Sequence, residues 1–120
     1  MSLEQNKAVV RRWHEILNER DVKAFDEVLH PDYVNYSSRT EMWGKGGVGI
    51  EATKTYWAEL FKRPDLFTTL VEDVIAEGNM VAARITWLVD GKPVGGCLSM
   101  YRLQDGKIVD DWYASRMIES

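Results

Sequence analysis

Apolar and polar residues alternate in short runs across the second half of the chain, from Leu66 to Arg116. Three turn sequences separate the runs, at Glu77-Gly78-Asn79, Asp90-Gly91 and Asp105-Gly106. Alternation is typical of strands with one buried face, and glycine and asparagine accept the positive φ of tight hairpin turns. The pattern therefore predicts a meander of four antiparallel strands, the last of which runs from Lys107 to Arg116.

The N-terminal part of the chain follows helical spacing instead. Ser2 and Gln5 form a capping-box pattern, and apolar residues then recur every three or four positions to about Glu19, which predicts a first helix. Asp21 is a good N-cap for a short second helix, and the proline of His30-Pro31 ends it. We therefore expect two helices that form one hairpin.

A strand, a loop and a third helix connect these two parts. Tyr33–Tyr36 is a short β-prone run, and Ser37–Gly49 contains four glycines and is expected to be a loop that is able to close over a pocket. A third helix is expected from Ile50 to Lys62, ending before Pro64-Asp65. This order of elements predicts an α+β fold in which helices cover one face of a curved, mainly antiparallel sheet.

Length and composition indicate how many domains the chain forms and which classes of partner are excluded. The chain has 120 residues, of which 45% are hydrophobic, and this suits one domain over residues 1–120 with a real core. The net charge is −4 and both signs are interspersed, so no basic surface for nucleic acid is expected. No apolar run approaches the roughly 18 residues of a membrane span. We therefore expect neither a nucleic-acid nor a membrane partner.

The numbers and spacing of the cysteine and histidine residues indicate a cellular location and whether a metal site is expected. The one cysteine, Cys97, cannot form an internal disulfide, so a reducing cytoplasm is the expected location. The two histidines, His14 and His30, have no cysteine or carboxylate at the spacing of metal ligands. We expect no metal and no cofactor.

One face of the predicted sheet is apolar although the helices do not cover it. Counting side-chain alternation outward from the last strand places six such residues there: Ile85, Trp87, Leu98, Met100, Trp112 and Ala114. A single-layer sheet in water normally has a polar outer face, so a partner is expected to bury this one. A homodimer through the outer sheet face is the simplest solution.

Several segments together carry a family resemblance. They are His30-Pro31-Asp32-Tyr33-Val34-Asn35, Pro64-Asp65-Leu66, Val71 to Gly78 with Val81 and Arg84, and Tyr101-Arg102-Leu103 leading to Asp105–Val109 with Trp112. With them the chain resembles the SnoaL-like branch of the nuclear-transport-factor-2-like superfamily. The resemblance implies a cone-shaped α+β barrel that encloses a pocket and commonly dimerises through its sheet. The superfamily includes polyketide cyclases, ketosteroid isomerases, epoxide hydrolases, dehydratases and proteins without known activity.

The catalytic sets of that superfamily are mostly missing from this sequence. The aspartate of SnoaL-type cyclases follows the last-strand tryptophan, where this chain has Tyr113. The positions of the ketosteroid-isomerase acids and tyrosine fall near Ser37, Ser99 and Trp13. The pattern of limonene-epoxide-hydrolase-like members keeps its arginine as Arg84 but loses both acids. The resemblance therefore predicts the fold and leaves the reaction open.

Asp111 is the leading catalytic candidate, because side-chain alternation places it in the pocket with Tyr113. Apolar walls would raise the pKa of Asp111 and suit it to proton transfer. Two structural alternatives stand beside this one: a solvated Asp110-Asp111 strand end, and a buried ion pair of Asp111 with Arg84. Arg84 could equally hold a carboxylate or enolate oxygen. Tyr113 could donate to a carbonyl or enolate oxygen, or simply pack.

The remaining pocket candidates are expected to bind substrate as its wall: Trp13, Tyr33, Asn35, Ser37, Trp57, Ser99 and Tyr101. A filled core without a ligand is the alternative for the aromatic members. His14 lies beside Trp13 on the first helix and could reach the mouth of the pocket, but lone helical histidines are usually surface residues, so a surface position is expected. Cys97 is expected to pack as a small apolar residue.

Two functions follow from these candidates. One is a cofactor-free isomerase, cyclase or dehydratase acting by proton transfer on a small apolar or aromatic carbonyl compound, with Asp111, Tyr113 and Arg84 as catalytic residues. The other is a non-catalytic, dimeric ligand-binding or scaffold protein. An Asp111 buried in an apolar cavity favours the enzyme, whereas an Asp111 in water beside a filled core favours the second function.

Overall fold

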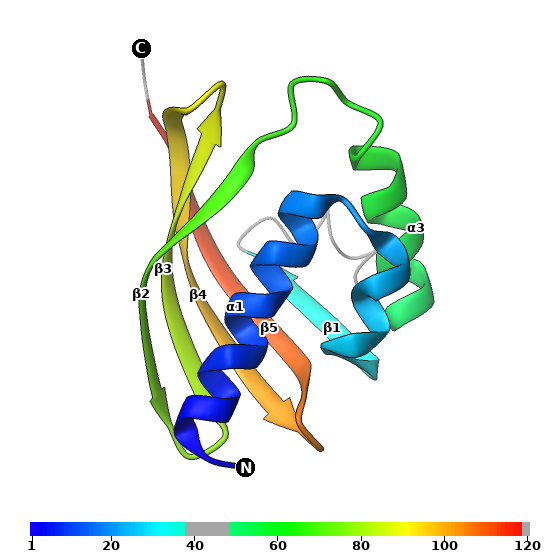
Figure 1. Ribbon diagram of the computed structural model, residues 1–120, viewed down its shortest axis with the longest axis vertical. Helices are drawn as coiled ribbons and strands as arrows, with labels where there is room; N and C mark the ends of the chain where they lie inside the picture. Colours follow the sequence, from blue (N-terminus) through cyan, green and yellow to red (C-terminus); the bar gives the residue numbers. More distant parts are fainter. Residues whose placement is uncertain (38–48, 119–120) are drawn as a thin grey trace.

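A curved five-stranded sheet carries all the helices on one of its faces (Figure 1). A computed structural model of the chain describes residues 1–37 and 49–118. Its elements, in order, are α1 (Leu3–Glu19), η1 (Val22–Glu27), β1 (Leu29–Ser37), α3 (Ile50–Leu60), β2 (Thr68–Glu77), β3 (Met80–Val89), β4 (Lys92–Gln104) and β5 (Lys107–Met117).

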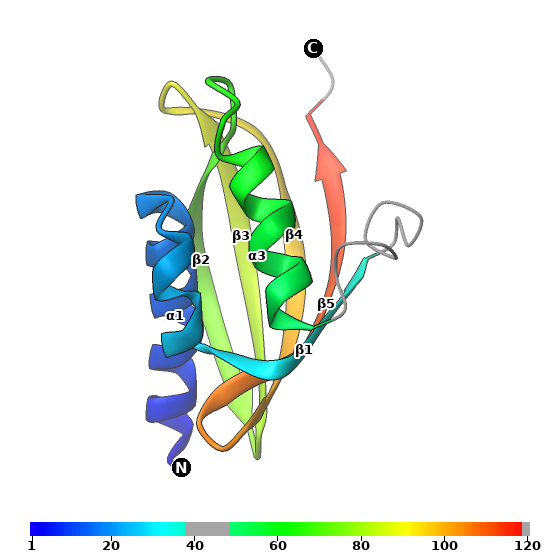
Figure 2. The same ribbon diagram turned by 90° about the vertical axis from the view of Figure 1, so that its right-hand side faces the viewer.

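The strands lie in the order β1-β5-β4-β3-β2, with β1 parallel to β5 and all other neighbours antiparallel. The sheet is not closed, because β1 and β2 form its two edges. Helices α1 and α3 both lie on one side of β2, β3 and β4 (Figure 1), and Figure 2 looks onto that side, with α3 in front of the strands. The predicted α+β fold, with helices on the concave face of a mainly antiparallel sheet, is confirmed.

Helix α1 begins and ends as its sequence predicts. The Ser2 hydroxyl accepts from the Gln5 backbone N–H at 3.0 Å, and the Ser2 N–H donates to Gln5 Oε1 at 2.8 Å, which completes the capping box. Arg20 closes the C-terminus in the left-handed conformation, with φ 57°. The buried side of α1, which includes Val10 and Ile16, packs on β2 and β3.

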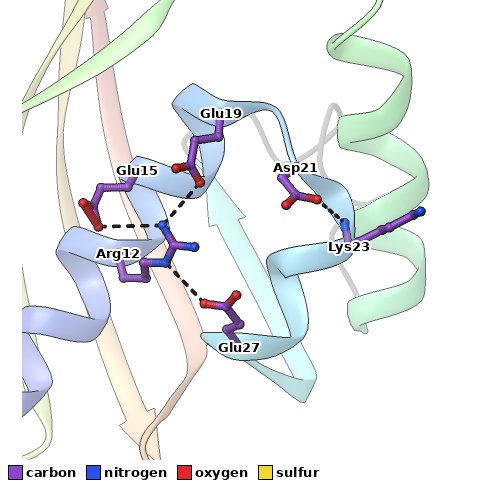
Figure 3. A network of polar contacts seen from close by, with 6 residues as sticks. All are labelled: Arg12, Glu15, Glu19, Asp21, Lys23 and Glu27. Carbon is purple, nitrogen blue, oxygen red and sulfur yellow. Dashed lines mark hydrogen bonds and ion pairs between the residues drawn. The ribbon is translucent and has the colours of Figure 1, made fainter.

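The second predicted helix is the 3-10 helix η1. The Asp21 side chain caps it by accepting from the Lys23 N–H at 3.1 Å. Arg12 of α1 joins the two helices, with Nη1 lying 3.2 Å from Glu19 and Nε 3.2 Å from Glu27 (Figure 3). These side chains are exposed, so the ion pairs contribute little to stability and chiefly orient the helices.

Strand β1 is longer than predicted. It begins at Leu29 and includes Pro31, which was expected to follow a helix rather than to lie in a strand. Proline is tolerated here because β1 is an edge strand whose pairing with β5 is interrupted between Leu29 and Val34. The predicted loop over residues 37–49 lies almost wholly outside the described residues. Among the described residues, no helix is long and apolar enough to cross a membrane.

The four-stranded meander and its three turns are confirmed. Asp90 and Gly91 have φ of 51° and 75°, and Asp105 and Gly106 have φ of 53° and 76°. Positive φ at both central residues is the geometry of the turn that matches the twist of two-residue hairpins. The two aspartate-glycine pairs therefore fix the reversals from β3 to β4 and from β4 to β5.

A β-bulge in the β3–β4 hairpin shifts its register by one residue. Leu88 is opposite Pro93, but Trp87 is opposite Gly95, so Val94 is the extra residue. Side chains at the two residues after Val94 would not fit, because a Cβ on Gly95 would lie 2.5 Å from the Arg116 backbone oxygen and a Cβ on Gly96 would lie 2.4 Å from the Ile85 backbone oxygen. The sequence therefore favours the bulge, because it has a proline and two glycines at the positions where the strands come close.

This bulge corrects three predictions about which face each β3 side chain occupies. Without it, Ile85 and Trp87 would lie with Leu98 on the uncovered face. With it, Ile85 is 2% exposed within the core, and Trp87 packs against the core. Arg84 is turned to the uncovered face instead. The uncovered face is nevertheless apolar, as predicted from β4 and β5, since Leu98 is 65% and Trp112 is 38% exposed.

Candidate functional site

A small cavity lies between the sheet and the helices, and its volume is about 70 Å³. We call it the inner cavity. Eight of the ten predicted site residues line it. The full lining is Trp13, His14, Leu17, Tyr33, Asn35, Trp57, Phe67, Thr69, Trp87, Cys97, Ser99, Tyr101, Asp111 and Tyr113.

A larger hollow of about 520 Å³ adjoins the inner cavity, and we call it the entrance hollow. The two share Trp57, Phe67, Trp87 and Tyr113. Phe67 and Trp87 stack there, with ring centroids 4.7 Å apart and planes 22° apart. A ligand that reaches the inner cavity this way passes between aromatic walls, while its polar end meets the side chains deeper inside.

Asp111 sits at the deep end of the inner cavity on β5. It is 5% exposed, and its backbone is paired with Asn35 of β1 on one side and Tyr101 of β4 on the other. The Tyr33 hydroxyl donates to Asp111 Oδ2 at 2.7 Å. Asn35 Nδ2 lies 3.3 Å from the same oxygen and 3.2 Å from the Tyr33 hydroxyl. Within the described residues, the other oxygen, Oδ1, is buried and has no hydrogen-bond partner.

The electrostatic setting of Asp111 is that of a proton-transfer group. Burial raises the pKa of Asp111 to about 7, and the hydrogen bonds from Tyr33 and Asn35 lower it in part. Burial also raises the pKa of Tyr33 and of Tyr101 well above the usual range, so both stay protonated. At neutral pH the carboxyl is therefore ready either to take or to give a proton.

His14 also lines the inner cavity, and the expectation that it lies at the surface is wrong. It is 6% exposed, its Nε2 is 2.8 Å from the Tyr101 hydroxyl, and its Nδ1 is 3.1 Å from Thr69 Oγ1. Burial lowers the pKa of His14 to about 4, so the ring is neutral at pH 7. The signal was present in the sequence, because His14 lies four residues after Val10 and three before Leu17, on the apolar side of α1.

Arg84 does not belong to this cavity. Its guanidinium lies on the uncovered face of the sheet, where Nε and Nη2 are each 2.7 Å from Asp73 Oδ2. Both predicted roles of Arg84, as an oxygen anchor and as a partner of Asp111, required the opposite face and are therefore wrong. The β-bulge at Val94 is the physical reason.

Two further residues, Ser37 and Cys97, lie on strands β1 and β4. Ser37 pairs with Tyr113 in the β1–β5 register, and its side chain lies outside the described part. Cys97 Sγ is 3.4 Å from Ser99 Oγ, and burial raises the pKa of Cys97, so it is a packed thiol rather than a reactive thiolate. In residues 1–37 and 49–118, no three His, Cys, Asp or Glu side chains are grouped to hold a metal ion.

A family model described as a SnoaL-like domain matches residues 10–111 of the chain. The chain belongs to the SnoaL-like domain family. The match extends from α1 to β5, so it includes nearly every residue of the inner cavity. Among curated proteins, none matches the chain significantly.

Solved structures share the fold of this SnoaL-like chain at low sequence identity. IdmH of Streptomyces antibioticus, described as a candidate polyketide cyclase, is 24% identical with a TM-score of 0.73, over 92% of this chain and 91% of that one. A candidate ketosteroid isomerase of Kribbella flavida is 16% identical with a TM-score of 0.79, over 98% and 82%. A limonene-epoxide-hydrolase-like enzyme of M. tuberculosis is 16% identical with a TM-score of 0.74, over 95% and 84%.

Proposed function

We propose that this SnoaL-like chain is a cofactor-free enzyme that transfers protons on a small apolar or aromatic carbonyl compound, as an isomerase, cyclase or dehydratase. The observation that carries the proposal is the buried Asp111, whose pKa is raised by burial to about 7 and whose Oδ1 has no partner in the described residues. A carboxyl with that pKa is an efficient acid and base at neutral pH. Structures of the same fold described as a candidate polyketide cyclase and a candidate ketosteroid isomerase support the reaction class.

In this proposal each polar side chain of the inner cavity has a distinct role. Asp111 Oδ1 takes a proton from the substrate and returns it to another atom, or to a leaving hydroxyl. Tyr33 and Asn35 hold Oδ2 and thereby fix the plane of the carboxyl group. Tyr113, at the junction with the entrance hollow, stabilises the negative charge that develops on the carbonyl oxygen. The aromatic side chains of Trp13, Trp57 and Tyr101 bind the apolar body and exclude water.

Hydrogen–deuterium exchange tests this proposal before the natural substrate is known. Aryl ketones are incubated with the protein in deuterated buffer, and exchange at the carbon next to the carbonyl is followed by proton NMR. The wild type should accelerate exchange, and Asp111→Asn should lower that acceleration by roughly 10²-fold or more, because it removes the proton-transfer group but keeps its shape.

The matched control is Asp73→Asn, which removes a carboxylate on the uncovered face, away from the inner cavity. It should exchange ketone protons as fast as the wild type. If ketones bind and none exchanges faster than in buffer, the enzyme proposal fails and the non-catalytic ligand-binding function takes its place. The replacement of the family's last-strand acid by Tyr113 is the observation that favours this second candidate.

A homodimer through the uncovered sheet face belongs to the same proposal. The apolar residues exposed there are Tyr36, Ile75, Leu98, Met100 and Trp112. The rings of Tyr36 and Trp112 stack with centroids 5.4 Å apart, and the hollow over this face has a volume of about 690 Å³. A second copy of the chain would remove this continuous apolar surface from water. The free thiol of Cys97 is in keeping with a cytoplasmic location, which we also propose.

A further inference from the structure

Two buried polar atoms at the deep end of the inner cavity have no partner among the described residues, and both are oxygen atoms. They are Asp111 Oδ1 and Asn35 Oδ1, and the two side chains are 5% and 9% exposed. The orientation of the Asn35 amide follows from its neighbours, because only its nitrogen can donate to the Asp111 carboxylate. Its oxygen is therefore the atom that remains unpaired, and it can only accept a hydrogen bond.

A chain of side chains behind the cavity determines the proton on His14. Asn18 Nδ2 donates to the Thr69 backbone oxygen at 2.8 Å, and Asn18 Oδ1 accepts from the Thr69 backbone N–H at 2.8 Å, so this amide cannot be reversed. The Thr69 hydroxyl donates to the same Oδ1 at 3.3 Å. Because the Thr69 hydroxyl proton is used in this way, the Thr69 oxygen accepts a hydrogen bond from His14 Nδ1 at 3.1 Å. We therefore assign the single proton of the neutral His14 ring to Nδ1.

This assignment also orients the Tyr101 hydroxyl. With its proton on Nδ1, His14 can only accept at Nε2, so Tyr101 donates to it across 2.8 Å. The Tyr101 oxygen therefore offers lone pairs to the cavity and no proton. The Tyr33 proton is likewise committed to Asp111, and the Ser99 hydroxyl already contacts Cys97 and lowers the pKa of Tyr101 through a hydrogen bond.

We infer that the deep end of the inner cavity binds a hydroxyl group of the ligand, since Asp111 Oδ1 and Asn35 Oδ1 are buried acceptors without a donor, and the nearby Tyr101 hydroxyl directs its proton to His14 instead of to them. The proposed substrates, which are small apolar or aromatic carbonyl compounds, are thus narrowed to those that also carry a hydroxyl group. The inference rests on the proposed function only in taking the same cavity as the ligand site. The inner cavity, at about 70 Å³, suits a small head that carries the hydroxyl, and the aromatic body extends toward Phe67 and Trp87.

Ligand binding is measured at a pH at which the ionisation state of Asp111 and of the groups around it is known. Besides Tyr113 of the same strand, the titratable groups that line the inner cavity with Asp111 are His14 from α1, Tyr33 from β1, and Cys97 and Tyr101 from β4. The pKa of His14 is lowered to about 4 and the pKa values of the other three are raised by burial. At a pH of about 8.5 Asp111 is therefore ionised, and none of these four groups is charged.

The experiment compares 1-phenylethanol with acetophenone, which have the same carbon skeleton and differ in a hydroxyl and a carbonyl. Their dissociation constants are measured by titration calorimetry at a pH of about 8.5. The alcohol should bind roughly tenfold more tightly than the ketone, because the ketone leaves the buried acceptors unpaired. Equal affinities, tighter binding of the ketone, or no saturable binding of the alcohol up to its solubility limit would each overturn the inference.

Two variants test the part played by Tyr101 and His14. Tyr101→Phe removes one acceptor and should weaken alcohol binding about fivefold while leaving ketone binding unchanged. His14→Leu frees the Tyr101 proton to point into the cavity, so the ketone should bind more tightly and the preference for the alcohol should shrink. Thermal unfolding confirms that both variants are folded. Weakening of both ligands by the same factor in each variant would mean that the pair is only structural.

The deuterium-exchange test of the proposed function is independent of these titrations. Asp111→Asn removes exchange but keeps a buried acceptor oxygen, so it should retain much of the alcohol preference. A protein that exchanges ketone protons but shows no preference for the alcohol refutes the inference alone. A protein that prefers the alcohol but never exchanges ketone protons refutes the proposed function alone.

Discussion

The Tyr33 hydroxyl donates to Asp111 Oδ2 across 2.7 Å, while Oδ1 of the same carboxyl has no partner within the described residues. One oxygen is thus held and the other is free for chemistry. The pair depends on the topology of the sheet, because Tyr33 on β1 reaches Asp111 only through the parallel β1–β5 pairing at the sheet edge. The difference in hydrogen bonding between the two carboxyl oxygens therefore arises from the order of the strands.

The pH dependence of catalysis tests this relationship. Activity that needs ionised Asp111 should rise with pH through a midpoint near the pKa of about 7. The hydrogen bond from Tyr33 lowers the pKa of Asp111, so Tyr33→Phe should move the midpoint to higher pH. Exchange rates measured across the pH range report both midpoints. A midpoint that stays in place in Tyr33→Phe would show that another group controls the reaction.

The stability of the protein should carry two opposing pH dependences. The folded-state pKa of Asp111 is about 7 against an ordinary 3.8, so between these values the folded state holds a proton that the unfolded chain has lost, and its contribution to the free energy of unfolding falls as pH rises. The folded-state pKa of His14 is about 4 against an ordinary 6.5, so there the unfolded chain holds the extra proton, and the contribution rises with pH.

Single variants separate these two contributions. In Asp111→Asn the His14 contribution remains, so stability should rise with pH between about 4 and 6.5, by up to roughly 1.4 kcal/mol per pH unit more than in the wild type. His14→Gln should show the opposite change. Asp111→Leu should be at least as stable as the wild type above pH 7, because it removes a buried charge. Urea unfolding at several pH values measures all three, and identical slopes in all variants would contradict the two burial effects.

The proposed dimer can be broken by one charge on the uncovered face. Leu98→Glu replaces a side chain that is 65% exposed, so it should fold normally and yield monomers. The matched control is Leu3→Glu, at a residue 44% exposed near the start of α1, which does not lie on the uncovered face. Light scattering at tens of micromolar should give twice the monomer mass for the wild type and the control. A wild-type monomer at this concentration would reject the dimer.

Ligand binding in the inner cavity should alter tryptophan fluorescence, because Trp13, Trp57 and Trp87 line it. Flat apolar compounds should quench this fluorescence in a saturable way, whereas nucleotides and sugar phosphates should not, because the ionised Asp111 repels their charge. Trp87→Ala should weaken apolar binding by roughly tenfold or more, since it removes half of the stacked pair with Phe67. Saturable binding of phosphates alone would overturn the assignment.

Much of the fold follows directly from local sequence signals. The aspartate-glycine turns fix the strand reversals, and the Ser2 capping box fixes the start of α1. The place of Asp111 in the cavity followed from alternation along the segment of β5 from Asp110 to Ala114, whose pairing with β4 is uninterrupted. Alternation failed for Arg84, because counting residues across the β3–β4 hairpin assumed no bulge, although Pro93 and the glycines after it are the residues that accompany one.

The prediction for His14 was also wrong, for a different reason than the prediction for Arg84. Residue type suggested a surface position, whereas helix geometry placed the ring on the buried side of α1. The deciding contacts, from His14 to Tyr101 and Thr69, join residues 87 and 55 positions apart in the chain. No local pattern contains such a contact, so the identity of the hydrogen-bonding partners became visible only in the folded chain.

The extra residue at Val94 makes the chemistry of the cavity depend on chain length as well as on residue type. Deleting one residue there would restore the uninterrupted register, turning Arg84 toward the helix side of the sheet and Trp87 away from the inner cavity. A single deletion would thus change which β3 side chains face the helices, without any substitution among them. Insertions and deletions in this hairpin would therefore alter the lining of the inner cavity as directly as substitutions do.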